Sequence, residues 1–478
     1  MMTSLELHDI QAYVMQDYPD MMYSRYIMLR VDHGPSAKQW LNHKVDDIAI
    51  ATPGGVVDPH QKTFLNIAFT SMGLIALGMH LDNVNAFSRE FREGMTAAHR
   101  QRLLGDVDGG APEQWNWGSE QSNAASLHVL LLAFGKNEEI CLQYVQELKL
   151  DYEQNGLFEI KYIDGRTLEN NKEHFGFRDG ISQPIILGSG QPGLAETMVQ
   201  PGEFILGYHN EYNVLPQSPL IQVDQGDQNL LAADAGGSGK KDLGRNGTYL
   251  VIRDLEQHVD KFWNYMNNKT QNEDGTINVD ESIKLSAKMM GRWPSGAPVT
   301  IYPYSDPGIF IDDNNFGYSH QDKEGSKCPF GAHVRRANPR DNFEDLSPKE
   351  SLKLSRRHRI IRRARLYGEP IIGSPLNHTY TGAVGLLFNC FNADISRQFE
   401  FIQYAWANVS KIKQLYNDPD PIIGAKELLD AGVEQNFTIQ DEPVNRAIKG
   451  LERFVTVKGG AYFFFPSISA LRYLASIK

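Results

Sequence analysis

The sequence predicts an α+β protein built on antiparallel sheets. Short segments rich in β-branched, aromatic and leucine side chains recur along the chain, and turn residues bound most of them. Segments with a helical spacing of apolar residues lie between them, but no regular alternation of strand and helix appears. The strand segments are also too widely scattered for a β-sandwich. These features favour an α+β fold over a parallel, doubly wound sheet.

Five segments are predicted to be strands. They are residues 25–31, 127–134, 247–255, 385–393 and 461–468. Helices are predicted directly after the third and the fourth strand, because apolar residues recur there every three or four positions. The first helix carries Val259, Phe262, Trp263 and Met266, and the second carries Ile395, Phe399, Ile402, Trp406 and Val409.

The length of the chain predicts two domains. It has 478 residues, of which 41% are hydrophobic, and this is enough for two cores of ordinary size. The polar segment 210–246 contains many glycines and two prolines, so we expect it to hold a long connection between two halves. Residues 267–282 are expected to form a solvated insertion.

Charge and composition argue against several kinds of partner. The formal net charge of −12 argues against nucleic acids and anionic membrane surfaces, because both require an excess of Lys and Arg. The three cysteines are far apart and form no CxxC motif, which fits a reducing compartment. The first 22 residues lack the basic and apolar regions of a signal peptide, and the longest apolar runs have the length of a strand. We therefore expect a cytoplasmic protein without a membrane span.

Two glycine-rich segments approach nucleotide-binding motifs without fulfilling them. Residues 188–193 match GxGxxG, but Pro201 follows too soon for a full helix, so a loop is expected. Residues 236–242 cannot form a P-loop, because Asp234 and Lys241 stand where it requires Gly and Ser or Thr. Neither HExxH nor GxSxG occurs, so the common hydrolases lose support.

The stretch HFGFRDGISQP, residues 174–184, places charged residues in an apolar and tightly turned setting. A surface turn would explain its glycines but not its phenylalanines. A core strand would explain the phenylalanines but not Arg178 and Asp179. A functional site accounts for both, since a buried carboxylate requires a reason.

The stretch CPFGAHVRRANPR, residues 328–340, places one histidine beside several arginines. A lone histidine is more often a packed core residue than a metal ligand, and the arginines could form a solvated basic face. Their combination nevertheless suits a planar ligand with carboxylates, such as haem, which needs one axial imidazole and cations for its propionates. Residues 356–368 contain six further arginines, and the apolar residues among them suggest that this stretch is half-buried rather than a basic surface.

Together these stretches resemble the dye-decolourising peroxidases. Residues 176–180 look like the GxxDG signature of that family, and other segments resemble it in the same order over nearly the whole chain. The long insertions look like those of the larger, loop-elaborated branch. The other similar segments are residues 66–78, 91–106, 247–259, 291–299, 328–340, 390–403 and 457–475.

The resemblance implies a fold and a cofactor. The fold would be two ferredoxin-like α+β halves, residues 1–215 and 247–478, which residues 216–246 connect. One haem b per chain would lie between the halves, bound mainly by the second, and noncovalently because no CxxCH motif exists. The substrates would be hydrogen peroxide and small organic reductants such as dyes and phenols. A homo-oligomer is compatible with the family, and surface Tyr or Trp residues would relay electrons.

The resemblance assigns the proximal side of the haem. His333 would be the iron ligand. Asp394 would accept the other imidazole N–H and make the ligand more electron-donating, but as a residue before a helical pattern it is equally suited to cap that helix. The propionate ligands are expected among Arg335, Arg336, Asn338 and Arg340.

The resemblance also assigns the distal side. Asp179 would move a proton from one peroxide oxygen to the other. Arg362 would stabilise the charge that develops, with Arg363 as the rival assignment. Ala364 stands where some members carry Asn. An ordinary aspartate has a pKa of about 4, so an acidic optimum for dye oxidation is expected.

Two other functions remain open from the sequence. A haem carrier or sensor would need His333 but neither Asp179 nor Arg362. A protein of two ferredoxin-like halves that binds another carboxylate ligand would need no iron at all.

Overall fold

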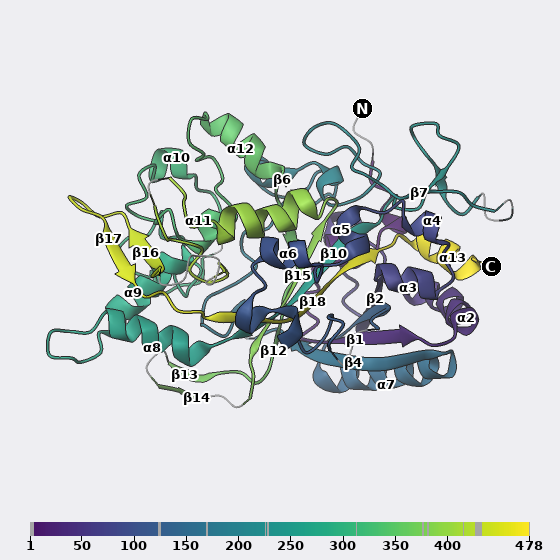
Figure 1. Cartoon of the computed structure of the whole chain (residues 1–478), viewed down its shortest axis with the longest axis horizontal. Coiled ribbons are helices and arrows are strands. Elements are labelled where there is room, and N and C mark those ends of the chain that lie inside the picture. The colour runs from purple at the N-terminus through teal and green to yellow at the C-terminus, as the bar shows by residue number, and fades with distance from the viewer. Residues whose placement is uncertain are drawn as a thin grey trace.

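The structure is a computed structural model. It describes residues 4–122, 126–168, 171–224, 226, 229–311, 313–374, 377–379, 382–413, 415–425 and 433–477. Two similar halves, each with antiparallel strands and covering helices, make up most of it (Figure 1).

The first half follows a βαββαβ order. Its strands are β1 (Tyr23–Val31), β2 (Thr63–Phe69), β3 (Val129–Gly135) and β4 (Leu157–Arg166). They pair in the order β2-β3-β1-β4, with Ile27 opposite both Leu131 and Tyr162. The helices α2 (Gly34–Lys44) and α7 (Glu138–Gln154) follow β1 and β3. This is the arrangement of a ferredoxin-like domain.

The second half repeats this order with longer insertions. Its strands are β10 (Thr248–Gln257), β11 (Ile361–Arg362), β12 (Arg365–Tyr367), β15 (Gly385–Asn392) and β18 (Val455–Phe465). β10 lies between β18 and β15, and the short strands β11 and β12 pair with the other edge of β15. The helices α8 (Val259–Lys269) and α9 (Val279–Met290) follow β10, and two π-helical segments, Ser396–Glu400 and Ile402–Asn408, follow β15.

The two sheets join at both edges. Phe464 of β18 pairs with Phe69 of β2, and Leu366 of β12 pairs with Arg166 of β4. The longer strands therefore form one closed ring, and in the part of the chain that the structure describes the short strand β11 pairs with β15 alone. In the sequence, the strands of the first half precede residues 216–246 and those of the second half follow them. The division into two domains remains a prediction. That segment holds a small sheet of β7 (Leu220–Ile221), β9 (Lys241–Asp242) and β8 (Ala232–Ala233).

Side chains of successive residues on these strands serve two different cores. Leu130, Leu132 and Phe134 of β3 belong to a cluster inside the ring, whereas Leu131 and Ala133 belong to the cluster under the helices. This alternation follows from the two-residue repeat of a strand. Because both faces are covered, the whole of β3 is buried, which explains its continuous apolar sequence.

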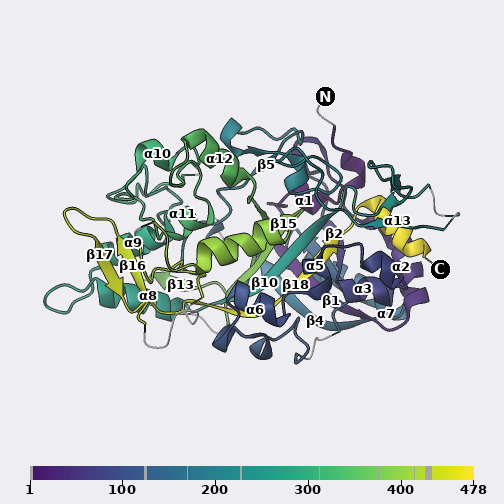
Figure 2. The ribbon, with the colours of Figure 1, turned by 45° about the horizontal axis from the view of Figure 1, so that its top comes forward.

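The second half has an additional core around α8 and α9. It includes Phe175 and Phe177 from the loop before β5, together with Phe262 and Trp293. α8 and α9, around which this core packs, lie at the end of the molecule that Figure 2 shows on the left. The C-terminal helix α13 (Ile468–Ser476) instead crosses back and packs against α2 of the first half.

Short elements complete the structure. The helices are α1 (Ala12–Met15), α3 (Ser71–Ala76), α4 (Leu81–Val84), α5 (Arg89–Glu93), α6 (Ala98–Leu104), α10 (Tyr318–Gln321), α11 (His333–Ala337) and α12 (Pro348–Arg356). The strand pairs are β5 (Ile185–Ile186) with β6 (Met198–Val199), β13 (Ile372–Ser374) with β14 (Asn377–Thr379), and β16 (Asn436–Ile439) with β17 (Arg446–Lys449). Within the described ranges, no helix is both long enough and apolar enough to cross a bilayer.

Candidate active site

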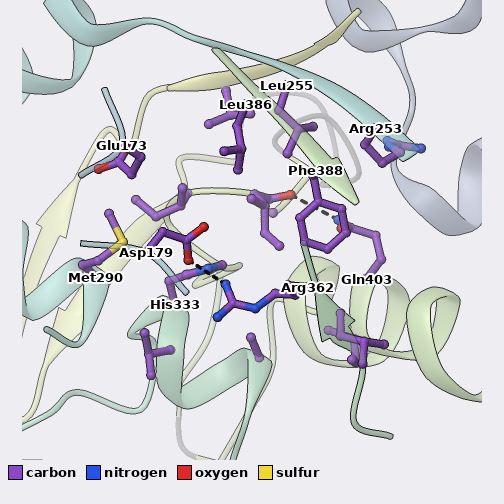
Figure 3. Close-up of a pocket in the computed structure, with 18 of the residues that line it drawn as sticks. Glu173, Asp179, Arg253, Leu255, Met290, His333, Arg362, Leu386, Phe388 and Gln403 are labelled. Atoms are coloured by element: carbon purple, nitrogen blue, oxygen red, sulfur yellow. Dashed lines mark hydrogen bonds and ion pairs between the residues drawn. The ribbon is translucent and has the colours of Figure 1, made fainter. Parts of the chain in front are cut away.

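A cavity lined by residues of both halves, mostly of the second, collects most of the residues that the sequence predicts to be functional. The loop 173–182, the helix α11 and residues 358–362 line it with polar side chains, while β10, β15 and β18 supply an apolar wall. Figure 3 shows Asp179, Arg362 and His333 directed towards the same space. The apolar wall consists of Leu255, Leu386, Phe388, Val455 and Val457.

Asp179 and Arg362 form an ion pair in this cavity. Nη1 of Arg362 donates to Oδ1 of Asp179 at 2.8 Å, and the backbone N–H of Gly180 donates to the same oxygen at 2.7 Å. Burial would raise the pKa of Asp179, but the charge of Arg362 and the Gly180 N–H outweigh it and lower the pKa below its ordinary value. The carboxylate is therefore ionised even in acidic solution. Gln183 connects the two elements, because its side chain exchanges hydrogen bonds of 3.1 Å with the backbone of Arg362.

The loop that carries Asp179 is held from both sides. Lys172 and Arg178 form a β-bridge across it, and Gly176 turns the chain with a φ of 96°. Phe175 stacks on Phe262 of α8, with 4.4 Å between ring centroids. The phenylalanines thus anchor the loop in the neighbouring core, while the tight turn leaves Asp179 facing the cavity.

His333 begins α11 and has a carboxylate partner behind it. Its Nδ1 lies 2.9 Å from Oδ2 of Asp420, which is fully buried. Oδ1 of Asp420 accepts the N–H groups of Ile422 and Ile423 at 2.9 and 3.0 Å. Burial would raise the pKa of Asp420, but the charge and hydrogen bond of His333 together with these N–H groups lower it. Because an ionised carboxylate can only accept, Nδ1 of His333 carries a proton, and although burial would lower the pKa of His333, the charge and hydrogen bond of Asp420 raise it.

The structure corrects the expectation that Asp394 is this partner. Oδ1 of Asp394 accepts the backbone N–H of Arg397 at 2.9 Å, and its other oxygen lies 3.4 Å from the Arg397 side chain. Asp394 therefore caps the π-helical segment, the alternative that the sequence left open. Asp420, at the end of the stretch NDPD, was not predicted, because nothing in its local sequence points to a distant histidine.

Two arginines expected as carboxylate ligands of the cofactor do not reach the cavity. Arg335 is paired with Asp322 at 2.9 Å and lies over Tyr318. Arg336 donates to the carbonyls of Trp406 and Val409 at 2.6 and 3.0 Å. Both side chains bond to internal partners and do not line the cavity, which argues against a role for them in binding a cofactor carboxylate.

The remaining expected residues divide between the cavity and its surroundings. Arg340 is not part of the lining and donates to the carbonyls of Asn314 and Phe316 at 3.0 Å. Asn338 does line the cavity, and its Nδ2 is buried without a hydrogen-bond partner. Arg363, the rival of Arg362, points away and donates to the carbonyls of Tyr13 and Val14.

The cavity also holds cations that the sequence analysis did not single out. Arg359 and Arg292 both line it, and among the described residues neither pairs with a carboxylate. Burial lowers the pKa of Arg359 to about 9, and the charges of Arg340, Arg362 and Arg356 contribute. Burial and Arg340 lower the pKa of Arg292 to about 10. The cavity is therefore short of negative charge.

Comparison with known proteins gives a consistent result. No family model matches the chain. It is 29% identical over 456 residues to a dye-decolorizing peroxidase of Mycena epipterygia. This alignment covers 88% of this chain and 77% of that protein. It is 32% identical over 315 residues to a multifunctional dye peroxidase of an Amycolatopsis strain, which covers 63% and 61% of the two chains.

Solved structures agree with these relatives. An ancestral D-type dye-decolorizing peroxidase superposes with a TM-score of 0.77 at 27% identity, covering 98% of this chain and 99% of that one. A dye-decolorizing peroxidase in complex with 2,6-dimethoxyphenol gives a TM-score of 0.76 at 25% identity, covering 99% and 100%. Fold, sequence and the ordered motifs agree: over most of its length the chain is similar to dye-decolourising peroxidases.

Proposed function

We propose that this protein is a haem peroxidase that reduces hydrogen peroxide while it oxidises dyes, phenols or other small organic reductants. The observation that carries the proposal is that one cavity contains both an Asp–Arg ion pair and a histidine with a carboxylate partner. The ion pair of Asp179 and Arg362 suits proton transfer, and the pair of His333 and Asp420 suits an iron ligand.

The charges of the cavity fit a haem. Its two propionates would supply the negative charge that Arg359 and Arg292 lack, and the unpartnered Nδ2 of Asn338 could donate to one of them. The apolar wall of the strands would face the macrocycle. Among the described residues no group of three or more His, Cys, Asp and Glu side chains could hold a metal ion. An iron at His333 would thus take its other ligands from a porphyrin.

His333 would hold the iron through Nε2, and Asp420 would set its strength as a ligand. The hydrogen bond from Nδ1 fixes the tautomer and orients the ring, and the negative charge of Asp420 makes the imidazole more electron-donating. In the absence of a CxxCH motif, we propose noncovalent haem b, one per chain. When bound, haem supplies the iron at which peroxide is reduced and to which organic reductants return electrons.

Asp179 and Arg362 would perform the proton chemistry. The ionised carboxylate of Asp179 would accept one proton of hydrogen peroxide and return it to the oxygen that leaves as water, while the haem, when bound, would supply the electrons. The guanidinium of Arg362 faces the same space and stabilises negative charge while the O–O bond breaks. The apolar wall excludes water from this step.

Organic reductants are the second class of substrate. A structural relative is described in complex with 2,6-dimethoxyphenol, which supports small phenols as reductants of this protein as well. The proposed oxidising substrate is hydrogen peroxide. A cytoplasmic location, a homo-oligomer and an acidic optimum remain predictions.

The test is a visible absorption spectrum of the protein reconstituted with haemin, before and after one equivalent of hydrogen peroxide. A Soret band that shifts rapidly in the parent, and at least about 100-fold more slowly in Asp179→Asn, would agree with the proposal. A Soret band that ignores peroxide would favour a haem carrier. Failure to bind haemin would favour a protein for another carboxylate ligand.

A further inference from the structure

A second carboxyl group, that of Glu173, lines the same cavity and has no part in the proposed chemistry. It lies six residues before Asp179 on the same loop (Figure 3). Burial raises the pKa of Glu173 to about 7, against three N–H donors that lower it, and Asp179 adds to the increase. The site therefore holds two acids with well-separated pKa values.

Glu173 organises the turn that presents Asp179. Its Oε1 accepts the backbone N–H of Phe177 at 2.8 Å, and its Oε2 accepts that of Phe175 at 2.9 Å. Its backbone N–H donates to the carbonyl of Phe177, and its carbonyl accepts from Gly176, both at 2.8 Å. These four bonds hold Glu173 in place at the base of the loop.

Gln257, at the end of β10, is a partner that suits both protonation states of Glu173. Its Nε2 lies 2.5 Å from Oε2 of Glu173, and its own Oε1 is buried without a hydrogen-bond partner. With Glu173 ionised, the amide donates as observed. With Glu173 protonated, a rotated amide would offer Oε1 to the carboxylic O–H, so that the buried oxygen gains a partner.

No cation balances the charge of Glu173 among the described residues. Its side-chain partners are the N–H groups of Phe175, Phe177 and Gln257, all of which are neutral. Asp179 and Arg178 are the charged groups on its own loop; Asp179 already pairs with Arg362, and His174 turns away to the carbonyl of Tyr367. Arg178, Arg292 and Arg359 line the same cavity. Ionisation of Glu173 thus makes the net charge of the cavity more negative without forming an ion pair among the described residues.

We propose that Glu173 holds a proton together with Gln257 and that loss of this proton sets the alkaline limit of dye oxidation. An additional buried negative charge stabilises the oxidised cofactor, so the site becomes a weaker oxidant of its reductants as pH rises. The inference rests on the proposed peroxidase function. Glu173 acts through the charge of the cavity and the position of the loop, not by touching substrate.

The test compares the haemin-reconstituted parent with Glu173→Gln, an isosteric variant without the titrating group. In the parent, dye turnover and the iron midpoint potential should both fall as pH rises through about 7. In Glu173→Gln, the decline in turnover should move to higher pH. When turnover is expressed as a fraction of each protein's maximum, the variant should exceed the parent about tenfold at pH 8. The iron midpoint potential of the variant should not change around pH 7.

Glu203→Gln is the matched control. Burial raises the pKa of Glu203 to about 7 as well, against the charge of Arg397, but Glu203 does not line the cavity. Its variant should keep the parent profile of turnover and potential. If Glu173→Gln retains that profile too, the proposal is overturned.

Two further measurements separate this inference from the proposed function. Infrared difference spectra of the haem-free protein should show a protonated carboxyl at pH 6 that Glu173→Gln lacks, whether or not peroxide is turned over; the absence of any such difference would contradict the inference. If Glu173→Gln does not fold, Gln257→Leu replaces it. Loss of the amide that serves both forms of Glu173 should shift the pKa of Glu173 and the alkaline limit with it, and an unchanged limit would again contradict the inference.

Discussion

At the scale of single residues, the pairing of Asp179 with Arg362 decides in which pH range the cavity holds a base. Arg362 is the main cause of the lowered pKa of Asp179, and burial acts in the opposite direction. Asp179 must be ionised to take a proton, so activity should be lost as pH falls through its pKa. This pKa lies below the ordinary value of 3.8, which agrees with the predicted acidic optimum.

Replacement of Arg362 should therefore move the acid limb upward. In Arg362→Leu, burial is no longer opposed by a neighbouring cation, so the pKa of Asp179 should rise above 3.8. We expect the rate of the peroxide-induced Soret change to decline at a higher pH than in the parent. The measurement is a stopped-flow pH profile. An acid limb at the same pH in both proteins would mean that another group controls it.

The partner of His333 can be identified with two aspartate variants. Asp420→Asn removes the charge behind the imidazole and should weaken haem binding about 10- to 100-fold. Asp394→Asn is the control, because Asp394 caps a helical segment and does not contact His333. Haemin titrations of the two variants give the answer. Equal weakening by both would contradict the assignment of Asp420.

At the scale of elements, the loop 173–180 shows how a turn can hold a carboxylate in an apolar setting. Glu173, Phe175 and Phe177 fasten it to the core, and Gly176 makes the turn that no other residue adopts easily. A methyl group at Gly176 would meet no atom within 4 Å, so only its φ of 96° resists substitution.

Gly176→Ala should accordingly lower the free energy of unfolding by about 1–2 kcal/mol. The control is Gly109→Ala, where the added methyl group also meets no atom but φ is not positive. Urea unfolding of the two haem-free variants measures the difference. If both variants lose the same stability, the conformation of Gly176 is not strained for alanine.

The strands of the structure were predicted unequally well. The five predicted strands correspond to β1, β3, β10, β15 and β18, with shifted ends. β4 was missed because Phe158 and Tyr162 are 51% and 47% exposed and its sequence is mixed, so pairing with β1 rather than apolar patterning holds it. The stripe around Phe399 and Trp406 is buried as expected, but the chain winds there as a π-helix, which apolar spacing does not distinguish from an α-helix.

At the scale of the whole molecule, the cavity carries a surplus of positive charge. Among the described residues, Arg359 hydrogen-bonds to the carbonyl of Ser182 alone, at 3.3 Å, and three neighbouring arginines disfavour its charge. A haem would supply the missing negative charges, so binding of the cofactor should stabilise the fold.

Arg359→Leu should separate the cost of the buried Arg359 charge in the haem-free protein from the stabilisation that haem provides. The haem-free protein should unfold at a higher temperature than the parent, because an unbalanced buried cation has been replaced by an apolar side chain. The haem-bound variant should gain less from haem and release it faster. Thermal unfolding with and without haemin measures both. A variant that is less stable in both states would show that Arg359 serves the fold rather than the cofactor.

The sequence by itself determined the fold class, the resemblance to dye-decolourising peroxidases and, from short motifs, several residues that face the cavity. Asp179, His333 and Arg362 could be named because each lies in a dense local pattern, and local patterns persist in the folded chain. Only the tertiary structure decided which partners these residues have. Asp420 lies 87 positions from His333, and Asp179 lies 183 positions from Arg362. Packing between distant segments also decides whether an arginine side chain bonds to an internal carbonyl or faces the cavity. The reason is that a guanidinium binds whatever acceptor the fold brings within reach.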